Sequence, residues 1–201
     1  MSVRLPKCLR DRRVIIVDVE TTGFKASADR VIEVGLLWIE SGEEVMGLSK
    51  LCNPGLDLPA DIVKLTGITQ EEVNEASPFS VIADFLIDTL ESPSVVIAYN
   101  SRFDFGFLRA EVSRCGKKLN ISDLVIDPLP WVRSEDKGMK CGLSVAAQRR
   151  GVKVKDAHRA LSDCHMTVGV LNTVRMPSSL DEALDYQFSL GSGFNKRSIR
   201  W

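Results

Sequence analysis

The chain has 201 residues, of which 44% are hydrophobic and 26% charged, and its formal net charge is −1. This is the composition of a globular domain with a sizeable core, and it excludes a global basic field that would hold nucleic acid non-specifically. The five cysteines lack C-x-x-C spacing, which argues against disulfides and structural zinc. Because no stretch resembles a signal peptide or a membrane span, we expect a cytoplasmic protein without membrane contact.

Residues 14–17 form an unbroken apolar run, which predicts a strand buried on both faces. The strand continues into Asp18 and Glu20, whose side chains point to the same face about 5–7 Å apart. Two such charges on a buried strand end are costly unless a cation neutralises them, and oxygen ligands suit Mg²⁺ or Mn²⁺. The alternative is a strand that ends in solvent with both acids hydrated.

Two more strands are predicted at residues 30–39 and 43–52, and they form an antiparallel meander with the first strand. Helical and strand patterns then alternate, with helices at 58–65, 69–75 and 79–90, a strand at 94–98, a helix at 103–115, a strand at 123–127, and helices at 141–150, 157–175 and 179–190. This order predicts an α/β fold with a mixed five-stranded sheet, three strands antiparallel and then two parallel, and helices on both faces.

The domain boundaries follow from these elements. We expect an N-terminal extension at residues 1–11, one domain at 12–176, and a C-terminal helix with a basic tail at 177–201.

Three further polar residues lie where they can join the first two acids. Asp104 falls in the first turn of a helix after the fourth strand, at the sheet edge where open α/β sheets bind ligands. Its alternative role is to complement the helix dipole alone. His158 precedes Asp163 by five residues at the start of the last long helix of the core. A lone histidine is more often structural, as we expect for His165, and Asp163 has the alternative of a solvated helix face.

Taken together, the motifs D-V-E-T-T-G, N-S-R-F-D and H-R-A-L-S-D resemble the three motifs of the DEDDh branch of the DEDD (DnaQ-like) exonuclease superfamily. This is the family of the proofreading epsilon subunit of DNA polymerase III and of RNase T-type enzymes. The resemblance covers about residues 12–175, and L-T-G-I-T at 65–69 and I-D-P at 126–128 also look like family landmarks. Tyr99 departs from the histidine of many members, and Cys164 from the usual alanine.

The resemblance implies an RNase H-like fold and 3′→5′ hydrolysis of nucleic acid, with release of 5′-mononucleotides, and we expect single-stranded DNA as the substrate. It implies that four carboxylates hold two Mg²⁺ or Mn²⁺ ions and that His158 is the general base, the carboxylates being those of Asp18, Glu20, Asp104 and Asp163. The terminal nucleotide would lie on a floor formed by Thr21, Thr22, Gly23 and Phe24. Phe103 would be the opposite wall, and core packing is the alternative for both phenylalanines.

The motifs leave other functions open. An exoribonuclease that trims short RNA or RNA 3′ ends also fits the motifs, because the motifs do not distinguish ribose from deoxyribose. A non-catalytic nucleic-acid-binding accessory module also fits the fold. The basic tail at 194–201 is a candidate contact for a polymerase or other protein partner, or for the substrate backbone. The preferred metal, the oligomeric state and the choice between proofreading, repair and RNA processing do not follow from the sequence.

Overall fold

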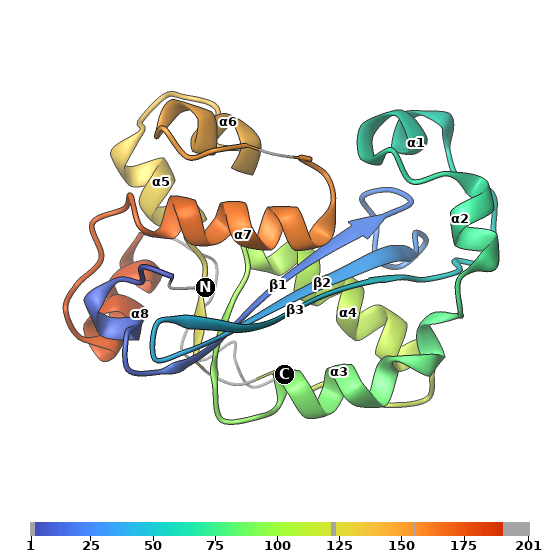
Figure 1. The fold of residues 1–201 in the computed structure, drawn as a ribbon, viewed down its shortest axis with the longest axis horizontal. Coiled ribbons are helices and arrows are strands. Elements are labelled where there is room, and N and C mark those ends of the chain that lie inside the picture. Colours follow the sequence, from blue (N-terminus) through green and yellow to red (C-terminus); the bar gives the residue numbers. More distant parts are fainter. Residues whose placement is uncertain (1–2, 122–123, 155, 191–201) are drawn as a thin grey trace.

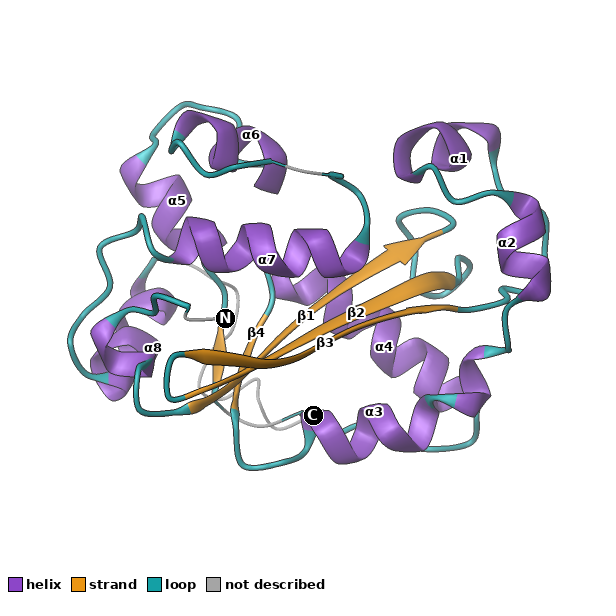
Figure 2. Cartoon of the chain, in the orientation of Figure 1, coloured by secondary structure: helices purple, strands orange, loops and turns teal. Residues whose placement is uncertain are grey.

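The computed structural model describes residues 3–121, 124–154 and 156–190. Within these ranges, one five-stranded sheet has the order β3-β2-β1-β4-β5, with helices on both faces (Figures 1 and 2). The strands are β1 (Arg13–Thr21), β2 (Val31–Glu40), β3 (Glu43–Leu51), β4 (Val95–Ile97) and β5 (Val125–Ile126). β1, β2 and β3 are antiparallel neighbours, whereas β4 pairs in parallel with β1 and β5 with β4. The predicted mixed sheet is confirmed.

The helices follow the predicted order with two differences. They are α1 (Ala60–Thr66), α2 (Gln70–Glu75), α3 (Ala83–Leu90), α4 (Ser101–Arg114), α5 (Leu129–Glu135), α6 (Leu143–Arg149), α7 (Ala160–Leu171) and α8 (Leu180–Ser189), with 3₁₀ turns η1 (Lys7–Leu9) and η2 (Phe79–Val81). α5 was not predicted, because Pro128 and Pro130 suggest a loop, yet a first helical turn tolerates proline. The helix expected at 79–90 is divided into η2 and α3 at Ile82, where φ is −104° and ψ is −4°.

β1 lies in the middle of the sheet and is buried on both faces, as its apolar run predicts. Ile16 packs in the core beneath α7, and Ile15 and Val17 pack in the core of the opposite face, which α3 and α4 cover. Because strand side chains alternate, Asp18 and Glu20 continue on the α7 side of the sheet. The fold therefore directs both acids toward the beginning of α7.

α8 fastens the end of the described chain to the sheet. The buried Gln187 donates from its amide to the carbonyl of Val125 (2.6 Å) and accepts the N–H of Asp127 (3.1 Å). The basic tail at 194–201 lies outside the described residues. No described helix combines the length and apolar character that a membrane crossing requires.

Candidate active site

Five side chains from distant parts of the chain meet at the carboxyl end of β1. The ligand atoms of Glu20, His158 and Asp163 all lie within 4.8 Å of one another. The carboxylate of Asp104 accepts the main-chain N–H of Val19 (3.1 Å), which fixes it beside β1. One cavity of about 200 Å³ is lined by all five predicted catalytic residues, Asp18, Glu20, Asp104, His158 and Asp163.

The carboxyl groups of this cluster resist ionisation. Burial, followed by the charges of Asp163 and Glu33, raises the pKa of Glu20 to about 8. Burial also raises the pKa of Asp163 to about 6, although His158 opposes the shift. For Asp18 and Asp104, burial is again the first cause and neighbouring acids a further one, and the pKa of each lies well above its ordinary value. A concentration of buried carboxylate oxygens is the donor set that a hard divalent cation prefers.

The start of α4, the helix that carries Asp104, is held by a buried acid that directly follows β5. Asp127, directly after β5, accepts the N–H groups of Asn100 and Ser101, each at 3.0 Å. Asn100 has the left-handed backbone geometry, with φ of 64°. These bonds tie the start of α4 to the carboxyl end of β5 and explain why α4 begins at Ser101, two residues earlier than expected. The sequence places Asp127 at the end of a predicted strand and within a family landmark, but it does not indicate these bonds.

A second buried acid, Glu33 on β2, positions the beginning of α7. Its carboxylate accepts bonds from the guanidinium of Arg159 (2.9 Å from Nη2), the hydroxyl of Ser49 (2.6 Å) and the N–H of Ala160 (2.9 Å). Burial alone would raise the pKa of Glu33, but these hydrogen bonds outweigh it and lower the pKa. Since Glu33 accepts the first helical N–H, α7 begins at Ala160 rather than near residue 157. This contact joins residues 127 positions apart, and no local pattern reveals it.

Gly35 lets α7 approach the sheet beside the acids. It pairs with Asp18 across β1 and β2. A Cβ at this position would lie 2.4 Å from the carbonyl carbon of Ala160 and 2.6 Å from the nitrogen of Leu161. Both are backbone atoms, so a side chain here would push the helix end away. The missing side chain is therefore part of what positions the site.

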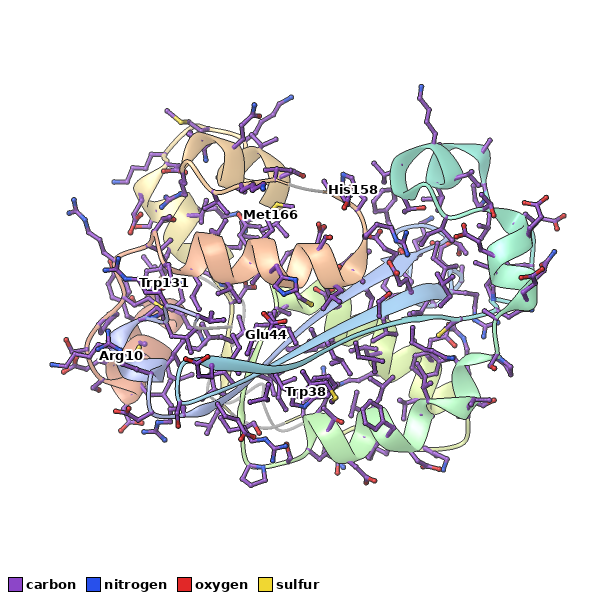
Figure 3. All side chains as sticks on the ribbon, in the orientation of Figure 1. Arg10, Trp38, Glu44, Trp131, His158 and Met166 are labelled. Atoms are coloured by element: carbon purple, nitrogen blue, oxygen red, sulfur yellow. The ribbon has the colours of Figure 1, made fainter. Side chains whose placement is uncertain are left out.

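His158 lies on the loop just before α7, beside α1 (Figure 3). Its main-chain N–H donates to the carboxylate of Asp163 (3.3 Å). Its φ of 64° is uncommon outside glycine and costs energy that the surrounding contacts must offset. The loop thus holds the imidazole near the acids in a constrained backbone conformation. From this place the imidazole can accept a proton or contribute a metal ligand.

The two phenylalanines flank the mouth of the cavity. Phe24 is 80% exposed, which excludes core packing for this side chain. Phe103 is half-buried, lies 6.5 Å from Phe24 between ring centroids and packs on Phe107 at 4.9 Å. An exposed aromatic ring beside a cluster of acids suits stacking against a planar group while leaving the acids accessible.

The threonines and glycine of the first motif have separate roles. Thr21 lines the cavity and donates to the carbonyl of Gly23 (2.6 Å). Thr22 is not among the lining residues, and its hydroxyl accepts the N–H of Arg30 (3.0 Å). A Cβ on Gly23 would lie 2.6 Å from the carboxylate of Asp29, so that carboxylate, which accepts the main-chain N–H of Lys25 (2.7 Å), would have to shift. Gly23 also lines the cavity, beside Thr21 and Phe24.

α1 contributes part of the lining that was not predicted. Ile62, Leu65 and Thr66 line the cavity, and the buried Ile62 packs with Ile32 and Ile68 to attach α1 to β2. The signal available in the sequence was the landmark L-T-G-I-T, which begins at Leu65. Tyr99 completes the lining.

Known proteins match both the sequence and the fold. The family model described as Exonuclease (RNase_T) matches residues 15–171. DNA polymerase III subunit epsilon of Treponema pallidum is 32% identical over 78% of this chain and 74% of its own length. DNA polymerase III PolC-type of Clostridium perfringens is 31% identical over 80% of this chain, which spans only 11% of that protein.

Solved structures of exonucleases share the fold. E. coli exonuclease I in complex with a dT13 oligonucleotide superposes with a TM-score of 0.69 and 19% identity, over 78% of this chain and 39% of that one. The family match over most of the length, together with this RNase H-like fold, shows that the chain belongs to the exonuclease family of the DEDD superfamily.

Proposed function

We propose that this chain is a metal-dependent 3′→5′ exonuclease that acts on single-stranded DNA and releases 5′-mononucleotides. The observation that carries the proposal is the convergence of four acids and His158 on one cavity whose mouth holds the exposed Phe24. The resemblance of the three motifs supports the direction of cleavage. The DNA polymerase names of the relatives and the oligonucleotide bound by exonuclease I support DNA as the substrate.

The acids fit the metal that this chemistry needs. Asp18, Glu20, Asp104 and Asp163 would hold two divalent ions, and Mg²⁺ or Mn²⁺ suits their oxygen atoms. Bound ions would supply Lewis-acid stabilisation of the charge that develops on the phosphate, and a lower pKa for the attacking water. The bound ions would offset the repulsion among the carboxylates and would thereby favour their ionised form.

His158 is the proposed general base. It would take the proton from a water that attacks the last phosphorus atom of the strand. The bond from phosphorus to the 3′ oxygen of the preceding nucleotide breaks, and its electron pair stays on that oxygen, which then takes up a proton. The products are a 5′-mononucleotide and a strand one nucleotide shorter with a free 3′ hydroxyl. The hydrogen bond from the main-chain N–H of His158 to Asp163 would hold the loop that carries the imidazole at this position.

The terminal base would stack on Phe24, with Phe103 behind it and α1 as the opposite side of the cavity. The hydroxyls of Thr21 and Thr66 already donate hydrogen bonds to main-chain carbonyls. The described lining residues would therefore contact a base mainly through shape and stacking. We therefore expect cleavage with little base preference.

The test is digestion of 5′-labelled substrates by the purified chain. Single-stranded DNA, duplex DNA, a duplex with a mismatched 3′ end and short RNA are each incubated with Mg²⁺, with Mn²⁺ and with EDTA. We expect single-stranded DNA to shorten stepwise from its 3′ end and EDTA to stop the reaction. Cleavage of RNA alone would assign the RNA-trimming function. Binding of the strands without any cleavage would make the chain an accessory module and overturn the proposal.

A further inference from the structure

A second groove adjoins the cavity of the proposed active site. It measures about 520 Å³ and shares one wall residue, Tyr99, with the smaller cavity. The hydroxyl of Tyr99 donates to the carbonyl of Cys141 (2.6 Å), which fixes this wall. The groove begins at the carboxyl end of β4 and is lined by Tyr99, Asn100, Leu129, Arg133, Met139, Cys141, Gly142 and Leu143. Because Tyr99 lines both, the cavity and the groove adjoin at this residue.

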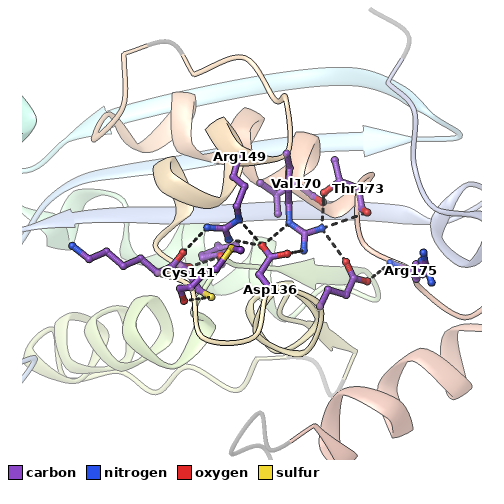
Figure 4. A network of polar contacts seen from close by, with 11 residues as sticks. Asp136, Cys141, Arg149, Val170, Thr173 and Arg175 are labelled. Carbon is purple, nitrogen blue, oxygen red and sulfur yellow. Dashed lines mark hydrogen bonds and ion pairs between the residues drawn. The ribbon is translucent and has the colours of Figure 1, made fainter.

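The acids of the segment beside the groove are already neutralised. Asp136 pairs with Arg149 and with Arg150 (2.8 Å), and Glu135 pairs with Arg150 (3.0 Å). Figure 4 shows these contacts as one network, which also reaches Thr173 and Arg175, both beyond the end of α7. The two carboxylates face the arginines of α6 and its end, so their charge is not available to cations at the groove.

The cations of the same segment are, by contrast, without carboxylate partners. Arg133 lines the groove and is exposed, and Lys137 and Lys140 follow on the loop to α6. None of the three forms an ion pair with a carboxylate in the part of the chain that the structure describes. The arginines near the first motif differ, because Arg30 and Arg114 are both paired with the buried Glu111. Arg133 thus brings to the groove a positive charge that is unpaired among the described residues, with Lys137 and Lys140 nearby in the sequence, in a protein whose overall charge is close to neutral.

We propose that this groove binds the part of the nucleic-acid strand that lies 5′ of the scissile bond, with Arg133 contacting a backbone phosphate. The inference rests on the proposed function, since it needs a strand whose 3′ end occupies the cavity. Met139, 57% exposed, and Leu143 supply apolar surface against which bases can lie regardless of their identity. The strand is held by charge and contact area rather than by base-specific hydrogen bonds.

The experiment compares a long and a minimal substrate in the Arg133→Ala variant. The long substrate is a single-stranded oligodeoxynucleotide, and the minimal one is the p-nitrophenyl ester of thymidine 5′-monophosphate, which has nothing 5′ of its scissile bond. Arg12→Ala is the matched control, because Arg12 is also exposed but precedes β1, at the opposite end of the strand from the acids.

We expect Arg133→Ala to raise KM for the oligonucleotide about three- to ten-fold, the effect of one exposed charged contact, and to leave ester hydrolysis unchanged. The dependence of log KM on log salt should flatten by about 0.7, as for the loss of one phosphate contact to a single strand. Arg12→Ala should leave both KM for the oligonucleotide and hydrolysis of the ester unchanged.

Two outcomes overturn the inference while the proposed function stands. Unchanged KM for the oligonucleotide would show that the groove does not hold the strand, as expected if it binds a protein partner instead. An equal loss on both substrates would show that Arg133 acts on the reaction centre or on the fold. Failure of the unsubstituted chain to hydrolyse either substrate would overturn the proposed function itself, and the inference with it.

Discussion

Gly35→Ala tests whether contact between α7 and the sheet positions the site. The added Cβ would lie 2.4 Å from the carbonyl carbon of Ala160, so the helix end must move by about 1 Å to reach an ordinary contact distance. Overpacking of this kind costs about 1–3 kcal/mol, or about 2–12 °C in Tm for a chain of this size. The same movement displaces His158 and Asp163, and a 1 Å misplacement can reduce catalysis about 100-fold.

The assay is kcat on a single-stranded oligonucleotide, measured at a temperature where circular dichroism shows the variant to be folded. Gly106→Ala on α4 is the control, because a Cβ there has no atom within 4 Å. That control should keep its activity and gain up to about 1 kcal/mol from helix propensity. Wild-type kcat and Tm in Gly35→Ala would refute the argument that this glycine positions α7.

Three further results are expected. Because the pKa of Glu20 is raised to about 8 and that of Asp163 to about 6, these two groups bind more protons in the metal-free folded chain than in the unfolded chain from about pH 4 to pH 8. Their contribution to stability therefore falls as the pH rises through that window. Mg²⁺ or Mn²⁺ relieves this repulsion, so the rise in Tm by scanning fluorimetry should be larger near pH 8 than near pH 6, and equal rises would contradict the assignment. His158→Ala should lower kcat about 10²- to 10⁴-fold while calorimetry shows metal binding preserved, and loss of metal binding would make His158 a ligand instead of the base. Phe24→Ala should raise KM for the oligonucleotide about five- to one-hundred-fold through loss of stacking, with Tm unchanged because the ring is exposed, and an unaltered KM would remove Phe24 from the binding surface.

Much of the site was accessible from the sequence because its signals are local. The apolar run before Asp18 indicated a buried strand, and the strand period placed Asp18 and Glu20 on one face. Asp104 was expected in the first turn of a helix after a strand, which is confirmed. Order and spacing of the motifs then linked these residues to His158 and Asp163, and the structure brings all five to one cavity.

The residues that position the site were not accessible in this way. Glu33 looks like an ordinary acid in the sequence, and Asp127 like a carboxylate that ends a strand within a family landmark. Only the folded chain shows both buried and bonded to the starts of α7 and α4. Glu33 and its partner Ala160 are 127 residues apart, and Asp127 and Ser101 are 26 apart. Helix and strand periodicity relates only residues close in sequence, so it cannot predict these contacts. Gly35 is similar, since a glycine within a strand suggests weak packing, whereas here it permits a backbone contact with a helix.

The central claim is that the acids at the end of β1 carry out metal-dependent cleavage from the 3′ end. Asp18→Asn tests it most directly, because it removes one charge from the cavity while retaining almost the same side-chain volume. Time-resolved gels of a 5′-labelled single strand with Mn²⁺ should show stepwise shortening by the unsubstituted chain and an intact strand with the variant, whose circular dichroism should be unchanged. Shortening by Asp18→Asn at the wild-type rate would contradict the account.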